Sequence, residues 1–284
     1  MLVYLNGAYL PQDQAVVPVE DRGFMLGDGI YEVTNTYSGR FFQLDAHLDR
    51  LERSAREVRL PLPVSRDELK RIFSDLMTRN NLPESSVYLQ LTRGVAPRTH
   101  AFPAQANPTL LIMARPLQWP AESWWEEGVA AITYSDLRWS RCDIKTINLL
   151  PNAMANTAAQ EAGAWEAILV RDGTAIEGSH SNFFAVFGDT VVTHPKDHRI
   201  LGGITRDVVV RLCADLGIPL KEAAVPVDDL ARANELFFTG TTCEVMPIVR
   251  VDGKAVGTAQ PGPTARRLRE ALHRLAGPKY RPTS

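Results

Sequence analysis

Two stretches in the first hundred residues repeat apolar side chains every three to four positions. In the stretch at about 45–60, the apolar positions are Leu44, Leu48, Leu51, Ala55 and Val58. In the next stretch, they are Leu69, Ile72, Phe73, Leu76 and Met77. Each repeat forms one buried stripe on a helix, and Ser65 with Glu68 forms a capping box. The pattern therefore predicts two amphipathic helices, the second beginning at Ser65.

Short apolar runs bounded by turn residues predict strands. These runs cover 87–92, 109–114, 128–134, 165–170, 183–187 and 190–193. The tight turns Asp172-Gly173 and Gly188-Asp189 favour antiparallel pairing of the later runs. Further helices are predicted at about 152–162, 206–216 and 263–275, and each ends at a glycine: Gly163, Gly217 and Gly277.

Two prolines and a change of pattern at 115–120 indicate a boundary between two domains. We predict a small α/β N-terminal domain over residues 1–117. Residues 118–284 are predicted to form a larger, mainly antiparallel β domain with flanking helices. The fold class is therefore α+β and not a doubly wound parallel sheet.

Composition limits the partners. The 284 residues are 45% hydrophobic and 23% charged, with a formal net charge of -2, so no basic surplus exists for nucleic acid. No apolar run reaches membrane-spanning length and no basic targeting segment opens the chain, so we expect a cytoplasmic protein without a membrane partner. Three widely spaced cysteines and an isolated His194–His198 pair indicate neither a disulfide framework nor a metal site.

Lys145 has the most unusual surroundings of the six lysines. It stands among the apolar residues Ile144, Ile147 and Leu149, which predict burial, and burial lowers the pKa of a lysine. Schiff-base chemistry needs the neutral amine, whereas an ordinary lysine has a pKa of about 10.4. Taken alone, the segment is more typical of a lysine that reaches solvent from a strand end or pairs with Asp143.

Gly202-Gly203-Ile204-Thr205 leads into the helix predicted from about Arg206. Free backbone N–H groups and the helix dipole make such a terminus suitable for a phosphate. The turn Thr239-Gly240-Thr241-Thr242 could supply further donors, and Arg50 a positive charge. Each feature also has a plain structural reading: a helix cap, a polar loop and a solvated arginine.

Two other groups are suited to an organic ligand. Glu177 precedes the polar cluster Ser179-His180-Ser181, where a carboxylate could keep a pyridine nitrogen protonated, although a capped turn has the same composition. Arg98 and His100 are two residues apart in a polar loop, so both can converge on one carboxylate. A solvated loop is the alternative.

Several segments together resemble the D-amino-acid transaminase group of the fold-type IV pyridoxal-phosphate enzymes, the branched-chain aminotransferase-like family. They are Asp21-Arg22-Gly23-Phe24, Gly27-Asp28-Gly29-Ile30-Tyr31-Glu32, His47-Leu48-Asp49-Arg50-Leu51 and Arg141-Cys142-Asp143-Ile144-Lys145. The resemblance spans almost the whole chain, and the motifs follow the family's order.

The resemblance implies that Lys145 forms the internal aldimine with pyridoxal 5'-phosphate and then moves the substrate's proton. It implies that Glu177 holds the pyridine nitrogen and that Leu201 packs against the ring. The implied phosphate ligands are Arg50, the backbone amides of Ile204 and Thr205, and Thr241. The implied ligands of the substrate carboxylate are Tyr31, Arg98 and His100. His180 and Gly240 depart from the family pattern, because hydroxyl residues are usual there.

The implied activity is transamination between D-amino acids such as D-alanine and 2-oxo acids such as 2-oxoglutarate, in a homodimer. Related alternatives share Lys145 and Glu177: branched-chain L-amino-acid transaminase, (R)-amine transaminase and aminodeoxychorismate lyase. The Arg98–His100 pair favours the D-amino-acid activity. A cofactor-free Schiff-base lyase and a non-catalytic metabolite-binding protein are alternatives from other classes, and either would be colourless without a response to pyridoxal phosphate.

Overall fold

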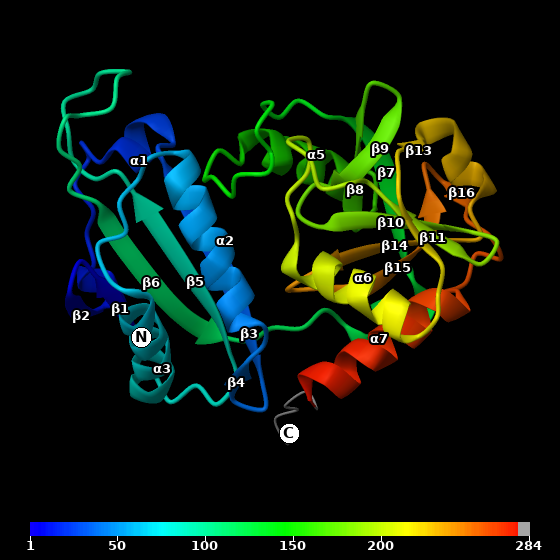
Figure 1. The fold of residues 1–284 in the computed structure, drawn as a ribbon, viewed down its shortest axis with the longest axis horizontal. Coiled ribbons are helices and arrows are strands. Elements are labelled where there is room, and N and C mark those ends of the chain that lie inside the picture. The colour runs from blue at the N-terminus through cyan, green and yellow to red at the C-terminus, as the bar shows by residue number, and fades with distance from the viewer. Residues whose placement is uncertain (278–284) are drawn as a thin grey trace. The chain divides into compact units, whose positions relative to one another are not determined.

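The computed structural model describes residues 1–277, which form two compact units (Figure 1). The first unit comprises Met1–Gln118 with Ile144–Asn148 and Gly277. The second comprises Trp119–Asp143 and Leu149–Ala276. The segment around Lys145 thus groups with the first unit, although it lies within the residues predicted for the second domain. The division into domains of 1–117 and 118–284 stays a prediction.

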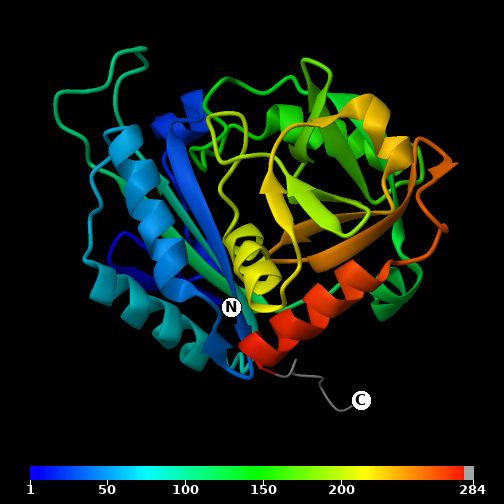
Figure 2. The same cartoon turned by 45° about the vertical axis from the view of Figure 1, so that its right-hand side comes forward.

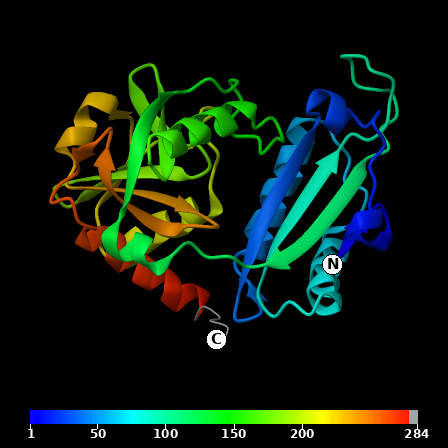
Figure 3. The same ribbon diagram turned by 180° about the vertical axis from the view of Figure 1, so that it is seen from behind.

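The first unit contains a six-stranded antiparallel sheet with the order β2-β1-β6-β5-β3-β4. The strands are β1 (Leu2–Leu5), β2 (Ala8–Pro11), β3 (Gly29–Tyr37), β4 (Arg40–Phe41), β5 (Ser85–Thr92) and β6 (Thr109–Pro116). Helices α2 (Leu44–Glu57) and α3 (Arg66–Arg79) pack against the sheet (Figure 1 and Figure 3), and the short helix α1 (Arg22–Leu26) precedes β3. The 3-10 helix η1 (Gln12–Gln14) follows β2.

Both predicted amphipathic helices are confirmed. The apolar stripe of α2, including Leu48 and Leu51, and that of α3, including Ile72 and Leu76, share one core with the sheet. At the start of α3, the Ser65 hydroxyl accepts a hydrogen bond from the Glu68 amide at 3.2 Å. Helix α2 ends at Glu57, earlier than the predicted residue 60. Arg59 adopts a left-handed backbone conformation, with a φ of 51°, which cannot continue a right-handed helix.

The second unit contains a ten-stranded sheet with the order β12-β11-β10-β14-β15-β7-β8-β9-β13, and β16 pairs with β15. The strands are β7 (Val129–Ser135), β8 (Glu166–Arg171), β9 (Thr174–Gly178), β10 (Asn182–Phe187), β11 (Thr190–Thr193), β12 (Leu220–Glu222), β13 (Val225–Pro226), β14 (Glu235–Gly240), β15 (Glu244–Val251) and β16 (Lys254–Ala255). Most pairings are antiparallel as predicted, but β7 is parallel to β8 and β15, and β11 is parallel to β12. An additional pairing of Glu177 with Asn182 joins β9 to β10, so the sheet closes on itself at Glu177.

The helices of the second unit are α4 (Glu122–Glu127), α5 (Leu150–Glu161), α6 (Ile204–Asp215), η2 (Val227–Arg232) and α7 (Pro263–Ala276). Figure 2 shows α6 in yellow beside α7 in red, and both helices pack against β14. Gly163, Gly217 and Gly277, after the helices, have positive φ as predicted. Within residues 1–277, none of the helices has the length and apolar character needed to cross a membrane.

Candidate active site

Lys145 lies on a short segment that runs beside strand β3. The Tyr31 amide donates to the Lys145 carbonyl at 3.0 Å, and the Ile147 amide donates to the Gly29 carbonyl at 3.1 Å. These backbone bonds fix Lys145 opposite Tyr31, and the Lys145 Nζ lies 4.1 Å from the centre of the Tyr31 ring. The structure therefore brings together the candidate Schiff-base lysine and one candidate ligand of the substrate carboxylate.

The Lys145 side chain is less buried than the sequence predicts. Its neighbours Ile144 and Thr146 are buried, whereas Lys145 itself is partly exposed. Alternate residues of an extended segment point to opposite sides, so the apolar neighbours cannot cover it. The Lys145 amide also donates to the Ser54 hydroxyl of α2, at 3.4 Å. Hydrogen bonds thus hold the backbone of the Lys145 segment, while the Lys145 side chain is partly exposed.

Glu32, the residue after Tyr31 on β3, forms a buried ion-pair cluster with α2. Arg50 donates from Nε to Oε1 at 2.7 Å and from Nη2 to Oε2 at 2.8 Å, and the His47 Nδ1 lies 3.0 Å from Oε2. Burial alone raises the pKa of Glu32, but the charge and hydrogen bonds of Arg50 lower it to about 2. Arg50, a candidate phosphate ligand, is therefore held by Glu32, a partner that the sequence analysis missed. The sequence did contain a sign of this partner: His47 and Arg50 are three residues apart, so they lie on one helix face and can contact the same carboxylate.

Replacing Glu32 with glutamine should lower the free energy of unfolding at pH 7 by about 3–5 kcal/mol, because Arg50 stays charged in a buried site without the carboxylate. The folded state holds Glu32 ionised more strongly than the unfolded state does. This contribution is present above the ordinary pKa of 4.5 and is lost as the pH falls toward 2. Urea unfolding at pH 7 and pH 3 should therefore give a smaller difference at pH 3.

Glu68 offers the matched control for this measurement. Its ion pair with Arg71 is exposed on α3, so Glu68→Gln should change the free energy of unfolding by about 1 kcal/mol or less. A Glu32→Gln effect of the same size at both pH values would contradict the charge explanation.

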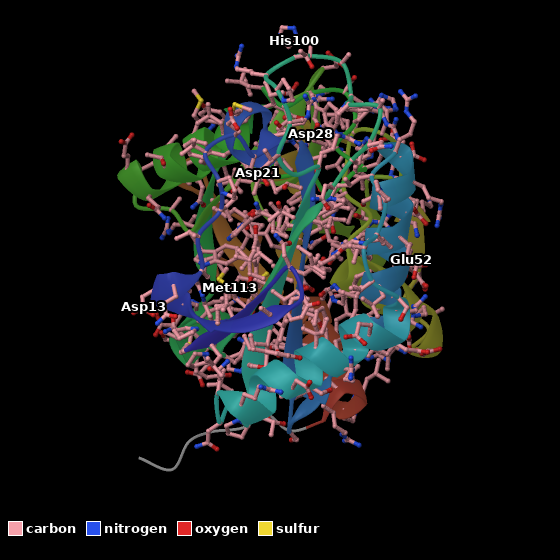
Figure 4. All side chains as sticks on the ribbon, turned by 90° about the vertical axis from the view of Figure 1, so that its left-hand side faces the viewer. Asp13, Asp21, Asp28, Glu52, His100 and Met113 are labelled. Atoms are coloured by element: carbon pink, nitrogen blue, oxygen red, sulfur yellow. The ribbon has the colours of Figure 1, made fainter. Side chains whose placement is uncertain are left out.

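Arg98 and His100 lie in the loop between β5 and β6, and both side chains are exposed. Figure 4 shows His100 at the outer end of this loop. Within residues 1–277, no hydrogen bond or ion pair joins either side chain to Tyr31 or Lys145. The structure thus does not assemble the three candidate carboxylate ligands within one chain.

Glu177 is buried near the end of β9. Its carboxylate accepts hydrogen bonds from Arg138 Nη1, from Asn182 Nδ2 at 3.0 Å and from the Leu201 amide at 3.1 Å. Burial raises the pKa of Glu177 to about 7, although Arg138 opposes this shift. Arg138 thus does not offset the whole cost of burying this carboxylate, so a second cationic partner would stabilise it further. The candidate residue Leu201 lies beside the same carboxylate.

Glu166 on β8, another residue that the sequence analysis missed, caps the turn after β9. Its Oε1 accepts from the His180 amide at 2.6 Å, and its Oε2 accepts from the Ser181 hydroxyl at 2.8 Å. Its Oε1 also lies 2.6 Å from the His180 Nδ1. The polar cluster at 179–181 is therefore a capped turn, and the carboxylate that caps it is Glu166 and not Glu177. Glu177 instead binds Arg138, Asn182 and Leu201.

Helix α6 begins at Ile204, two residues earlier than predicted, so Thr205 lies in its first turn and does not cap it. Gly203 precedes the helix, and a Cβ there would lie 1.9 Å from the Asn182 Oδ1. Asn182 also pairs with Thr239 across the sheet. Thr239 and Gly240, predicted as part of a turn, are the last residues of β14, and the turn begins at Thr241. The α6 N-terminus and this end of β14 therefore both flank the start of β10.

Two observations at this end of β10 fit an anionic ligand. The buried Thr239 hydroxyl has no hydrogen-bond partner among residues 1–277. The amides of Ile204 and Thr205 lie at the positive end of a 12-residue helix. At Gly240, a Cβ would lie 3.2 Å from the Cys243 Sγ, so the usual hydroxyl residue would need Cys243 to move. The second unit thus combines donors for a phosphate with the Glu177 carboxylate.

Comparison with known proteins gives similarity over nearly the full length. The family profile of amino-transferase class IV matches residues 29–251. D-alanine aminotransferase from Bacillus licheniformis is 43% identical over 272 residues, and the one from Staphylococcus haemolyticus is 40% identical over 273 residues. Each alignment covers 96% of this chain and 96% of the relative.

Solved structures share the fold. The branched-chain amino acid aminotransferase of Escherichia coli has a TM-score of 0.92 at 28% identity, covering 96% of this chain and 94% of that chain. That of the archaeon Thermoproteus uzoniensis, solved with norvaline, has a TM-score of 0.87 at 28% identity, covering 96% and 94%. A third branched-chain amino acid aminotransferase, solved with pyridoxamine 5'-phosphate, has a TM-score of 0.92 at 29% identity, covering 99% and 95%.

Proposed function

The chain belongs to the amino-transferase class IV family, and from this we propose transamination between D-amino acids, such as D-alanine, and 2-oxo acids, such as 2-oxoglutarate. It is a fold-type IV aminotransferase that depends on pyridoxal phosphate. The observation that carries the substrate class is the 43% identity with a D-alanine aminotransferase over 96% of both chains.

Each unit, taken by itself, contains residues that are chemically suited to pyridoxal phosphate, which when bound withdraws electrons from the reacting carbon. We propose that Lys145 holds the cofactor covalently through Nζ and moves the substrate's proton at the same atom. In the second unit, Glu177 would keep a proton on the pyridine nitrogen and Leu201 would pack against the ring. The proposed phosphate ligands are Arg50, the Ile204 and Thr205 amides, and Thr241.

The raised pKa of Glu177 supports its role. Even with Arg138 as a partner the pKa of Glu177 is about 7, and a protonated pyridine nitrogen would stabilise the ionised form further. The unpaired Thr239 hydroxyl, buried among the described residues, and the N-terminus of α6 support the proposal that the phosphate binds near Glu177.

Tyr31, Arg98 and His100 are the proposed ligands of the substrate carboxylate. Because Arg98 and His100 are exposed on a loop, we propose that the site is completed in a homodimer. The first unit also exposes large apolar side chains, namely Val16, Val17, Val19, Phe24 and Phe102, which a second copy would cover. A cytoplasmic location is part of the same proposal.

Branched-chain L-amino-acid transamination is the second candidate, because solved branched-chain enzymes share the fold at a TM-score of 0.92. Their identity of 28–29% is lower than the 43% of the D-alanine enzyme. A half-reaction scan separates the two. The purified holoenzyme is mixed with D-alanine, L-leucine and (R)-1-phenylethylamine separately, and conversion to the pyridoxamine form is followed by absorbance. Fastest conversion with D-alanine is expected, and fastest conversion with L-leucine would establish the second candidate instead.

Replacing Glu177 with glutamine should retain bound pyridoxal phosphate but slow the D-alanine half-reaction by about 10²-fold or more, because the amide no longer favours a protonated ring nitrogen. Single-turnover absorbance measures the rate, and the cofactor content is measured on the same sample. Unchanged turnover with saturating D-alanine would rule out this role.

A further inference from the structure

The loop that carries Arg98 and His100 is closed at its base by one buried carboxylate. Asp21 is fully buried, and its Oδ2 accepts from the Thr92 hydroxyl at 2.9 Å and from the Thr109 hydroxyl at 2.7 Å. These threonines are the last residue of β5 and the first residue of β6. A bridge between Gly94 and Asn107 lies just beyond them. The two ends of the loop are therefore tied together.

A second buried cluster reaches from this base into the loop. Arg22 and Arg93 are each 2% exposed, and the Nε of each donates to the same Asp28 Oδ2 at 2.8 Å. Asp28 is itself 11% exposed. Figure 4 shows Asp21 and Asp28 beneath the loop and His100 at its outer end. One carboxylate thus orients two guanidinium groups.

Each guanidinium holds the loop at a different point. Arg22 donates from Nη1 to the Thr99 carbonyl at 2.7 Å. The Arg93 guanidinium carbon lies 3.6 Å from the centre of the Phe102 ring, while its two Nη atoms donate to the carbonyls of Arg59 and Val58. Thr99 stands between Arg98 and His100, and Phe102 follows two residues later. One anchor therefore lies between Arg98 and His100, and the other lies two residues beyond His100.

We infer that Arg22 and Arg93, oriented by Asp28, are positioning residues that fix the Arg98–His100 segment for the substrate carboxylate. This inference rests on the proposed function, in which Arg98 and His100 bind that carboxylate. A loop with exposed side chains has many conformations. Holding it at the Thr99 carbonyl and at the Phe102 ring removes the conformations in which Arg98 is misplaced. Neither Arg22 nor Arg93 needs to touch the substrate.

Two variants test the anchors independently. Arg22→Met removes the bond to Thr99 but leaves Asp28 paired with Arg93. Phe102→Ala removes the ring contact at a side chain that is 45% exposed, so folding is not at risk. Trypsin cleaves after arginine, so the rate at which the Arg98–Thr99 bond is cut, followed by mass spectrometry of the fragments, reports loop mobility without any catalysis. Cleavage there should accelerate by about tenfold or more in Arg22→Met, the factor that a hydrogen bond from a charged donor provides.

In both variants, kcat/KM for D-alanine should fall by about 10- to 100-fold, mainly through KM. The half-reaction with (R)-1-phenylethylamine, which has no carboxylate, should change by less than about twofold. Arg71→Met, at an exposed arginine of α3, is the matched control and should change neither cleavage nor kinetics.

Unchanged cleavage after Arg98 in both variants would overturn the inference, and so would equal losses with D-alanine and the amine. Failure of the proposed function has a different signature: the unmodified holoenzyme would not convert with D-alanine, whereas the cleavage comparison would still report the anchors.

Discussion

Replacing Lys145 with alanine is expected to slow transamination of D-alanine by about 10²- to 10⁴-fold, the range that one positioned acid–base group contributes. The Lys145 Nζ lies 4.1 Å from the centre of the Tyr31 ring, and we propose that this atom both holds the cofactor and moves the proton. The variant loses both roles. Steady-state rates with D-alanine and 2-oxoglutarate measure the loss of proton transfer.

Borohydride reduction followed by peptide mass spectrometry measures the loss of covalent cofactor attachment. In the unmodified protein, reduced cofactor should be found on the peptide that contains Lys145, and the visible absorbance should disappear. The Lys145→Ala protein should carry no covalent cofactor. Lys70→Ala is the control, because Lys70 pairs with Asp45 at an exposed site and should leave both results unchanged. Cofactor attached to another lysine, with normal rates in Lys145→Ala, would refute the assignment.

Truncating Arg98 to alanine should cost about 2–5 kcal/mol of transition-state stabilisation with D-alanine, roughly 30- to several-thousand-fold in kcat/KM. The reason is the loss of a guanidinium that, in the proposed homodimeric site, would pair with the substrate carboxylate away from water. Bound cofactor should be retained, since none of its proposed ligands is changed. The half-reaction with (R)-1-phenylethylamine should be nearly unaffected, because that amine has no carboxylate.

The comparison of the two substrates within one variant separates a carboxylate ligand from a structural residue. Arg71→Ala on the exposed face of α3 controls for the general loss of a surface arginine. Equal losses with D-alanine and the amine would show that Arg98 is structural or linked to the cofactor. The substrate class would then have to be chosen again among the class IV activities.

The sequence by itself determined the elements whose burial follows a simple period. Helices α2 and α3 were predictable because each buries one apolar stripe, and β10 was predictable because its run of apolar residues is bounded by turns. Lys145 could also be singled out, because the sequence contains only six lysines and the other five have charged or turn-rich neighbours. The α6 N-terminus was located to within two residues from its glycines.

Strand β3 could not be predicted in the same way, because its second half contains Thr34, Asn35 and Thr36. These polar residues are buried, and the Thr36 hydroxyl donates to the buried Glu84 carboxylate at 2.9 Å. In a sequence, a buried polar residue with a distant partner looks the same as a solvated one.

Only the tertiary structure decided the partners of the charged site residues. Arg50 binds Glu32 across 18 positions, and Arg138 binds Glu177 across 39. Such pairs depend on strand register and on the face to which each side chain points, and a shift of one residue would reverse that face. Residue types and motif order therefore indicated the chemistry of the candidate site, whereas the pKa of Glu177 and the anchors of the Arg98 loop arise from contacts that exist only after folding.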